Sequence, residues 1–310
     1  MVNEESLENN NNFESKIGEK KKLKKRIIIE IFIGAFLILA VWTYKHLSFT
    51  NDKLISAIQN NDVKEVTLIL KTKKISHVNL NEALLEAIYN DNLIIVKILV
   101  ESGADINYCG KDSYSNPLLR AAYYGYADIT KYLLDKGADT HITLPKNPYT
   151  PLAISVMKGN IATTKLLVEK ENSIDYKDNY GITALIYALD TQDFNKELCE
   201  FLVSKGANIE TRDDSSDSTL LIRVTSSDKN SEIKVKFLLD HGANINATDS
   251  VKMTPFLTAV QCGNLNLVKL YIEKGANIFA RNTWNQSALD LAKQHNHGEI
   301  YGFLKKHGLN

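Results

Sequence analysis

The sequence predicts an all-α repeat solenoid of about eight stacked helix-turn-helix units with β-hairpin fingers, preceded by a single transmembrane helix. Three observations predict this architecture. A glycine-containing motif returns every 33 to 36 residues, a motif typical of helix starts returns in phase with it, and an 18-residue apolar stretch precedes both. The predicted parts are a polar and basic tail at 1–26, the transmembrane helix at 27–44, a linker at 45–50 and the repeat domain at 51–310.

The tail ends in a cluster of basic residues directly before the apolar stretch. The cluster consists of Lys20, Lys21, Lys22, Lys24, Lys25 and Arg26. The stretch from Ile27 to Tyr44 carries Glu30 as its only charged residue, and a helix of that length spans roughly 27 Å of hydrocarbon. Trp42 stands near its far end, where interfacial aromatic residues are expected. The excess of basic residues before the stretch places the N-terminus in the cytoplasm and the repeats outside it, in the periplasm if the chain is bacterial.

Two alternatives to an uncleaved anchor remain for the apolar stretch. A cleaved signal peptide would make the protein an exported or secreted effector that acts on a partner in another cell, but Ala40-Val41-Trp42 places tryptophan where a small residue is required. A buried soluble helix would have nothing to pack against, because the stretch is apolar all round and lies outside the repeats. The uncleaved anchor is therefore the prediction.

The first repeated motif marks the end of each unit. Its copies are Gly103-Ala104-Asp105, Gly137-Ala138-Asp139, Gly206-Ala207-Asn208, Gly242-Ala243-Asn244 and Gly275-Ala276-Asn277. A degenerate copy occupies Glu171 to Asp175, and Gly308 follows Gly275 by 33 residues. Glycine after a helix supplies the left-handed conformation that ends it, so each copy predicts a helix end.

The second motif marks the start of a helix in each unit. Its copies are Asn116-Pro117-Leu118, Thr150-Pro151-Leu152, Thr183-Ala184-Leu185, Ser218-Thr219-Leu220, Thr254-Pro255-Phe256 and Ser287-Ala288-Leu289. A serine, threonine or asparagine side chain caps the first amides of a helix, and proline at the next position presets the backbone angle φ. Two short apolar runs lie between the motifs, each too short to be stable alone. The unit is therefore helix, turn, helix and loop.

This pattern resembles the ankyrin repeat, whose period of ~33 residues and Thr-Pro-Leu-His-x-Ala opening it matches. The resemblance covers about residues 51–310 as eight units. The histidine of the family opening is absent, and its positions are taken by Leu85, Leu119, Ala153, Ile186, Leu221, Leu257 and Asp290. The sixth unit departs furthest, with polar residues at Asp213–Asp217 and a longer turn at Thr225–Ser231. We expect it to be the softest joint of the array.

The resemblance implies that the protein binds a protein partner, because stacked units expose a concave surface of finger tips and first-helix ends. The residues expected at those positions are Tyr89, Tyr114, Tyr123, Tyr124, Tyr149, Met157, Tyr180 and Trp284. Aromatic residues with a polar end are enriched at protein interfaces. The chain has 14 tyrosines, so simple surface exposure is the alternative explanation for some of them. The predicted function is a membrane-anchored protein that mediates protein–protein interaction through this surface.

Composition and motifs argue against other classes of function. The 37 basic and 37 acidic residues balance, which gives no basis for nucleic-acid binding. Cys109, Cys199 and Cys262 are too far apart for a zinc site. His295–Glu299 falls on an expected inter-helix turn, and Asp213–Asp217 lacks the spacing of a calcium loop. No nucleotide-binding or nucleophile motif is present. We therefore expect no enzymatic activity, no metal or other cofactor and no small-molecule substrate.

Overall fold

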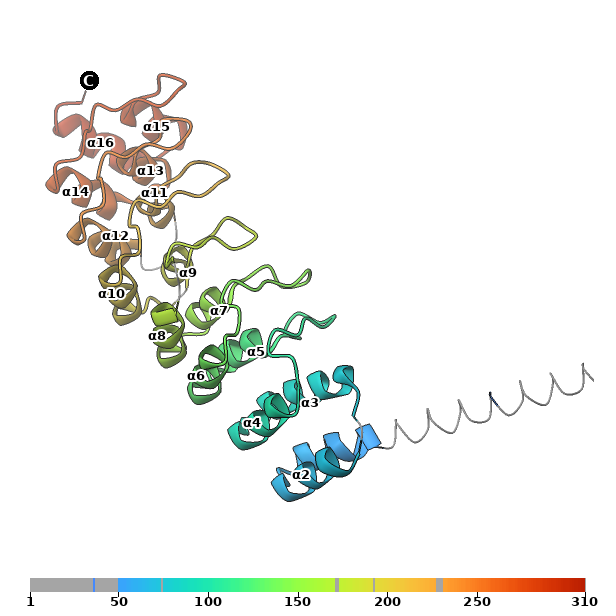
Figure 1. The fold of residues 1–310 in the computed structure, drawn as a ribbon. Coiled ribbons are helices and arrows are strands. Elements are labelled where there is room, and N and C mark those ends of the chain that lie inside the picture. The colour runs from blue at the N-terminus through green and yellow to red at the C-terminus, as the bar shows by residue number, and fades with distance from the viewer. Residues whose placement is uncertain are drawn as a thin grey trace, which may run out of the picture. The chain divides into compact units, whose positions relative to one another are not determined.

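The computed structural model describes most of the chain beyond residue 50. The described residues are 36, 50–73, 75–170, 173–191, 193–226 and 231–309. They divide into two compact units, Met1–Ala83 and Leu84–Asn310 (Figure 1). In the described part, the regular structure is helical, with two isolated β-bridges and no longer strand.

The first unit contains the opening helix pair. Residues 50–59 are helical and lead through a tight turn into α2 (Val63–Thr72). The Asp62 side chain caps α2 by accepting a hydrogen bond of 2.9 Å from the amide of Glu65. Helix α3 (His77–Tyr89) begins in this unit and continues into the second.

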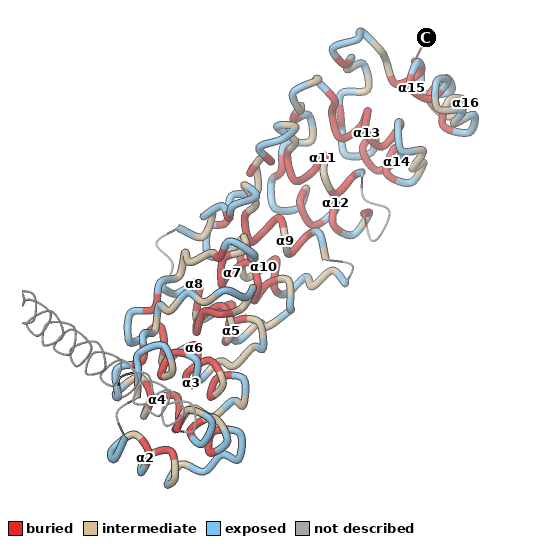
Figure 2. Tube along the Cα trace, turned by 90° about the vertical axis from the view of Figure 1, so that its right-hand side faces the viewer, coloured by how far each residue is buried: buried red, intermediate tan, exposed pale blue. Residues whose placement is uncertain are grey.

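The second unit is a succession of helix pairs. Its helices after α3 are α4 (Leu93–Glu101), α5 (Pro117–Tyr124), α6 (Ala127–Asp135), α7 (Pro151–Met157), α8 (Ile161–Lys170), α9 (Ala184–Asp190), α10 (Lys196–Ser204), α11 (Leu220–Thr225), α12 (Ser231–Asp240), α13 (Pro255–Gln261), α14 (Leu265–Glu273), α15 (Ala288–Gln294) and α16 (Gly298–Lys306). From α5 onward the odd-numbered helices pack in one row and the even-numbered helices in a second row, with the connecting loops projecting beyond the first row as fingers (Figure 1). Buried residues line the surfaces where these helices meet (Figure 2). The predicted helical repeat architecture is therefore confirmed in this unit.

Polar side chains cap the first helix in most of the described repeats. Thr183 is the exception, because it stands at the start of α9 without a side-chain cap hydrogen bond. Asn116, Thr150, Thr254 and Ser287 each accept a hydrogen bond from the amide three residues further on. The predicted helix starts are therefore confirmed at these positions. Each of these caps satisfies an amide that has no partner within the helix, which explains the recurrence of the motif in these repeats.

The sixth repeat starts one residue later than predicted. Thr219, and not Ser218, is the cap of α11, and its hydroxyl accepts from the amide of Ile222 at 3.5 Å. Ile222 therefore takes the position of the family histidine that the sequence assigned to Leu221. The sequence offered two adjacent capping residues and no proline to choose between them.

The Gly-Ala-Asp/Asn motif closes the second helix and also links one repeat to the next. Gly206 follows α10 with φ of +95°, a conformation that favours glycine. The side-chain oxygen of Asn246 accepts a hydrogen bond of 2.8 Å from the amide of Asn277, and that of Asn107 accepts one of 2.9 Å from the amide of Asp139. The polar residue of the motif is thus part of the stacking contact.

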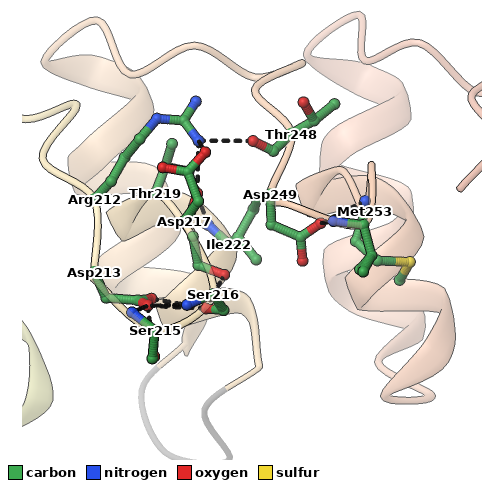
Figure 3. A network of polar contacts seen from close by, with 12 residues as sticks. Arg212, Asp213, Ser215, Ser216, Asp217, Thr219, Ile222, Thr248, Asp249 and Met253 are labelled. Atoms are coloured by element: carbon green, nitrogen blue, oxygen red, sulfur yellow. Dashed lines mark hydrogen bonds and ion pairs between the residues drawn. The ribbon is translucent and has the colours of Figure 1, made fainter. Parts of the chain in front are cut away.

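The predicted β-hairpin fingers are short turns, and in the described part of the chain their strand pairing is limited to two isolated antiparallel bridges, Leu144 with Asn147 and Arg212 with Thr219. In addition to backbone bonds across the turn, such as that from the amide of Asp249 to the carbonyl of Met253 at 3.1 Å, a side-chain oxygen inside the turn accepts backbone amides. Asp249 accepts from the amides of Val251 and Met253 at 2.9 and 2.8 Å (Figure 3). Asp178 and Asn282 do the same in their own fingers. The finger arms are too short for a longer ladder, so side chains add to the backbone bonds that close the turns.

The polar loop of the sixth repeat is tied down where the structure describes it. Asp213 accepts from the amides of Ser215 and Ser216 at 3.0 and 2.7 Å, and Arg212 donates to the carbonyl of Thr248 in the next finger at 2.8 Å (Figure 3). Burial alone would raise the pKa of Asp213, but the bonds from Ser216 and Ser215 lower it. These bonds hold the described part of the loop in place, which argues against the expectation that the sixth unit is the softest joint. Residues 227–230 of the longer turn lie outside the described residues.

The predicted membrane helix at 27–44 lies outside the described residues, Phe36 apart. Within the part of the chain that the structure describes, no helix combines the length and the apolar character needed to cross a membrane.

Candidate functional site: the tyrosine surface of the finger face

The fingers and the first helices of the repeats form one continuous face of the second unit, which we call the finger face (Figure 1). Helix α5 ends at Tyr124 and α7 ends at Met157, so the last residues of these helices border this face. Tyr114 and Tyr149 lie in the fingers that lead into the same two helices. Helix stacking at one repeat period therefore brings residues about 34 positions apart into a row.

Five tyrosines of the second and third repeats form a connected group, the tyrosine cluster. Its members are Tyr89, Tyr114, Tyr123, Tyr124 and Tyr126. The Tyr124 ring is 5.6 Å from the Tyr89 ring, 5.0 Å from the Tyr123 ring and 5.5 Å from the Tyr126 ring, measured between centroids. The Tyr114 and Tyr123 rings are 4.3 Å apart. Such edge-to-face and offset arrangements are favourable for aromatic pairs, so the rings support one another.

The backbone beneath the tyrosine cluster is held by a half-buried arginine. Arg120 donates one hydrogen bond to the carbonyl of Tyr114 at 3.1 Å and another to the carbonyl of Leu85 at 3.0 Å. The hydroxyl of Tyr126 donates to the carbonyl of Tyr89 at 3.3 Å. These bonds join the second and third repeats under the rings. A partner would therefore meet rings that are already in place, which reduces the entropy cost of binding.

The exposed surface of the tyrosine cluster is substantial. Tyr89 is 52% exposed and Tyr124 is 40% exposed. The ammonium of Lys158 lies 4.2 Å from the centroid of the Tyr123 ring and covers that side of the cluster. The cluster is therefore open on the side of Tyr89 and Tyr124.

A second group of aromatic residues lies in the fourth and fifth repeats. The Tyr149 ring is 5.7 Å from the Tyr180 ring and 5.6 Å from the Tyr187 ring. The hydroxyl of Tyr187 donates to Asp178 at 2.6 Å, and Asp178 is the residue that closes the finger turn. Burial, followed by this hydrogen bond, raises the pKa of Tyr187 well above its usual range. Tyr187 is therefore a neutral phenol that fixes the finger against α9.

A groove adjoins the second group between the turns that follow α7 and α9. Its volume is about 890 Å³, and its apolar walls include Met157, Tyr187 and Phe194. Lys158 also lines the groove, so it connects the groove with the tyrosine cluster. Polar residues such as Asp190 form the rest of the wall.

The turn that forms one wall of the groove is supported from the sixth repeat. Lys234 is 2% exposed and donates its ammonium hydrogen to the carbonyl of Thr191 at 3.1 Å. Burial lowers the pKa of Lys234. The Phe194 ring packs edge-on against the Phe237 ring at 5.7 Å. Thr191 and Phe194 of this turn are therefore held by contacts with α12, including one from the buried Lys234.

The structure brings most of the predicted binding residues together, although not all in one group. Tyr89, Tyr114, Tyr123 and Tyr124 share the tyrosine cluster, Tyr149 and Tyr180 share the second group, and Met157 lines the groove. Trp284 lies apart from them in the finger of the last repeat, where it is 64% exposed.

Sequence reasoning missed Tyr126 and Tyr187. Tyr126 precedes α6 and Tyr187 lies inside α9, so neither occupies a finger tip or a first-helix end. Tyr187 is four residues beyond its helix cap, as Arg120 and Arg223 are beyond theirs. That position carries long polar side chains in three repeats, and this was the available signal in the sequence.

His297 and Cys199, which were considered above as metal ligands, have roles in the fold. His297 lies in the turn between α15 and α16, and its Nε2 bonds to the carbonyl of Gln261 at 3.0 Å. Burial raises the pKa of the Cys199 thiol to about 12, so it is protonated at neutral pH. Among the residues that the structure describes, no group of three or more histidine, cysteine or acidic side chains is arranged to hold a metal ion.

Comparison with known families agrees with this geometry. The family description "Ankyrin repeats (3 copies)" matches residues 54–143 and 118–213, and "Ankyrin repeats (many copies)" matches residues 238–292. The chain belongs to the ankyrin repeat family. The ankyrin match covers the helix pairs that carry the tyrosine cluster, the second aromatic group and the groove.

Individual relatives of this ankyrin repeat protein are distant. An ankyrin repeat protein of Acanthamoeba polyphaga mimivirus is 27% identical over 114 residues, which is 36% of this chain and 69% of that protein. A chain from the complex of a predatory endopeptidase of Bdellovibrio bacteriovorus with an immunity protein is 26% identical, covers 64% of this chain and 99% of its own length, and superposes with a TM-score of 0.54. The ankyrin repeat domain of Bcl-3, of the IkappaB family, is 22% identical, covers 74% and 96%, and has a TM-score of 0.59. The likeness to Bcl-3 concerns the fold alone.

Proposed function

We propose that this ankyrin repeat protein binds a partner protein through its finger face, with the tyrosine cluster at the centre of the interface. The observation that carries the proposal is the connected and partly exposed arrangement of five tyrosines over the fixed backbone of two adjacent repeats. Tyrosine is enriched among the few residues that dominate interface energies. The similar Bdellovibrio chain comes from a protein–protein complex, which supports the same class of function.

The proposed role is binding without catalysis. The second aromatic group and the groove extend the surface toward the fifth repeat, so a partner that covers the tyrosine cluster reaches them as well. An interface of standard size buries about 800 Å² on each protein. A partner of ordinary size therefore contacts several repeats at once.

The test is the loss of a captured partner in a double variant. The full-length protein is crosslinked to its surroundings in intact cells and then extracted in detergent, and the captured proteins are identified by mass spectrometry. Tyr123→Ala with Tyr124→Ala is expected to weaken binding of the captured partner at least about 30-fold, the effect of removing an interface hot spot. Gln261→Ala with Cys262→Ala changes the structurally equivalent positions of the seventh repeat and is the matched control.

Two results decide the outcome of this experiment. Equal binding by the Tyr123/Tyr124 variant and the wild type, with helical content unchanged by circular dichroism, contradicts a function of the tyrosine cluster. Equal losses in both double variants would place the interface elsewhere on the array or indicate general damage to it.

We also propose that residues 27–44 anchor the protein in a membrane, with the N-terminus in the cytoplasm and the repeats on the other side. The support is the apolar stretch with Glu30 as its single charge and the basic residues before it. Protease added to intact spheroplasts is expected to digest the repeats, and protected repeats contradict this topology. The alternative is an exported effector, and it predicts a mature N-terminus beyond residue ~45, which N-terminal sequencing detects.

A further inference from the structure

Two exposed carboxylates stand two residues from members of the tyrosine cluster, Asp91 after Tyr89 and Asp128 after Tyr126. Asp91 lies in the turn between α3 and α4, and Asp128 lies in the first turn of α6. Both are exposed, and neither forms an ion pair within the part of the chain that the structure describes. Burial, followed by repulsion from Asp128, raises the pKa of Asp91.

A hydrogen bond joins the tyrosine rings to the chain segment of Asp91, because the hydroxyl of Tyr126 donates to the carbonyl of Tyr89, two residues before Asp91, at 3.3 Å. In agreement with this placement, burial and then the charge of Asp91 raise the pKa of Tyr126. Tyr126 is stacked on Tyr124, whose ring meets that of Tyr89 at 77°. The faces of aromatic rings carry negative potential, so rings and carboxylates attract the same type of ligand, a cation.

Two cations that contact the tyrosine cluster, Arg120 and Lys158, already have partners. Arg120 uses its guanidinium for two backbone carbonyls beneath the rings. Lys158 lies over the ring of Tyr123, which is not among the three rings of the open side. Glu86 and Asp112 place further negative charge around Arg120. The open side at Tyr89, Tyr124 and Tyr126 therefore combines exposed ring surface with an excess of negative charge.

We propose that this side of the tyrosine cluster receives an arginine or lysine side chain of the partner, so that the docking segment of the partner is basic. The aliphatic part of such a side chain would lie on Tyr89 and Tyr124, and its cationic end would reach Asp91 and Asp128. A guanidinium fits best, because it stacks on rings and binds carboxylates with several donors at once. The charge of the site disfavours nucleic acids and anionic membranes as ligands.

The inference rests on the proposed function and refines it. The nearly balanced charge of the whole chain gives no preference for a charged partner. The balance hides a local excess, because many acidic residues elsewhere are paired with lysine or arginine, as Asp190 is with Arg223 at 2.6 Å. A basic partner is therefore selected at one site and not by long-range attraction to the whole protein.

The experiment measures binding of a fluorescent, end-blocked tetra-arginine peptide to the full-length protein in a non-ionic detergent, by fluorescence anisotropy. Saturable binding is expected, and Asp91→Asn with Asp128→Asn is expected to weaken it at least about threefold. Binding is also expected to weaken as ionic strength rises from about 0.05 to about 0.5 M. Asp240→Asn with Glu273→Gln removes the same charge from exposed positions on α12 and α14 and is the matched control.

Two outcomes overturn the inference. In the first, the peptide does not bind saturably. In the second, the control variant weakens peptide binding as much as the Asp91/Asp128 variant does. A third outcome concerns the chain's own basic cluster at residues 20–26. If replacing those basic residues with glutamine strengthens peptide binding, the site is occupied by this tail, and the inference of an outside partner is wrong.

The proposed function and the inference fail in different ways. Suppose that the captured partner no longer binds the Tyr123/Tyr124 variant but binds the Asp91/Asp128 variant as tightly as the wild type. The proposed interface is then supported, and the inference of a basic docking segment is wrong. If neither variant affects the captured partner, both are wrong.

Discussion

The tyrosine region (residues 84–204) and the C-terminal region (residues 211–309) share one scaffold but present different side chains on the finger face. Tyr123 and Tyr124 occupy the seventh and eighth positions after the cap Asn116. The same positions after the cap Thr254 hold Gln261 and Cys262. Caps, stacking bonds and buried helix faces are the same in the two regions. The difference therefore lies at positions that the fold leaves free.

This comparison separates residues that specify the fold from residues available for binding. The buried positions repeat because every helix pair must bury the same face against its neighbours. The positions at the ends of the first helices have no such constraint. Tyrosines accumulate at these positions in one region only, whereas the exposed aromatic finger residues of the other region include Phe279 and Trp284. This difference is the one that the proposed binding surface requires.

The largest expected effect tests whether the two regions have equivalent scaffolds. Leu119 and Leu257 stand three residues after their caps, and both are fully buried. Leu119→Ala and Leu257→Ala are each expected to lower the free energy of unfolding by about 2–5 kcal/mol, through lost apolar burial and the cavity that remains. Urea denaturation followed by circular dichroism measures both.

The matched comparison for these leucines is the Tyr123→Ala and Tyr124→Ala double variant, whose positions are at most partly buried. It should change stability much less than either leucine variant while weakening partner binding more. A double tyrosine variant that unfolds as easily as the Leu119 variant would mean that the tyrosines belong to the scaffold.

A smaller effect should distinguish the caps of the two regions. Asn116 accepts from the amide of Leu119 at 3.0 Å and also donates to the carbonyl of Tyr108 at 3.1 Å, whereas Thr254 accepts from the amide of Leu257 at 3.2 Å. Thr254→Ala is expected to cost about 0.5–2 kcal/mol, as for a lost cap. Asn116→Ala should cost about 1 kcal/mol more, because it also leaves a carbonyl in the finger without its donor. Equal losses in denaturant unfolding would show that the second bond of Asn116 contributes nothing.

The fold could be predicted from the sequence because its signals are local. Capping residues, proline at the first helical position and glycine after the second helix recur at one period, so each repeat confirms the others. The start of the sixth repeat was assigned wrongly, since Ser218 and Thr219 can both cap a helix and only three-dimensional packing selects Thr219. The fingers were expected as β-hairpins, and the structure has short turns in which buried residues such as Asp178 add side-chain bonds to the backbone bonds.

The site was harder to predict because it depends on contacts between repeats. Tyr89 and Tyr124 lie in different repeats, and only stacking brings their rings to 5.6 Å. Tyr126 joins the cluster from the turn before α6, a position with no special role in the sequence pattern. Lys234 supports a turn 43 residues earlier in the chain, which no local pattern can indicate.

The smallest expected effect concerns the hydrogen bond from Lys234 to the carbonyl of Thr191, which joins the two regions. Burial lowers the pKa of Lys234, so between its folded and unfolded pKa values the unfolded chain binds more protons than the folded chain. The unfavourable contribution of the charged ammonium is therefore fully present near neutral pH and is relieved as the pH rises toward 10.5, the ordinary value for lysine. The wild type should gain slightly more stability than Lys234→Met between pH 7 and about pH 10. Urea unfolding of both proteins at the two pH values measures the difference, and the variant corrects for tyrosines and other groups that ionise in the same range. An equal change in both proteins would mean that the ammonium of Lys234 is as well solvated in the folded protein as in the unfolded chain.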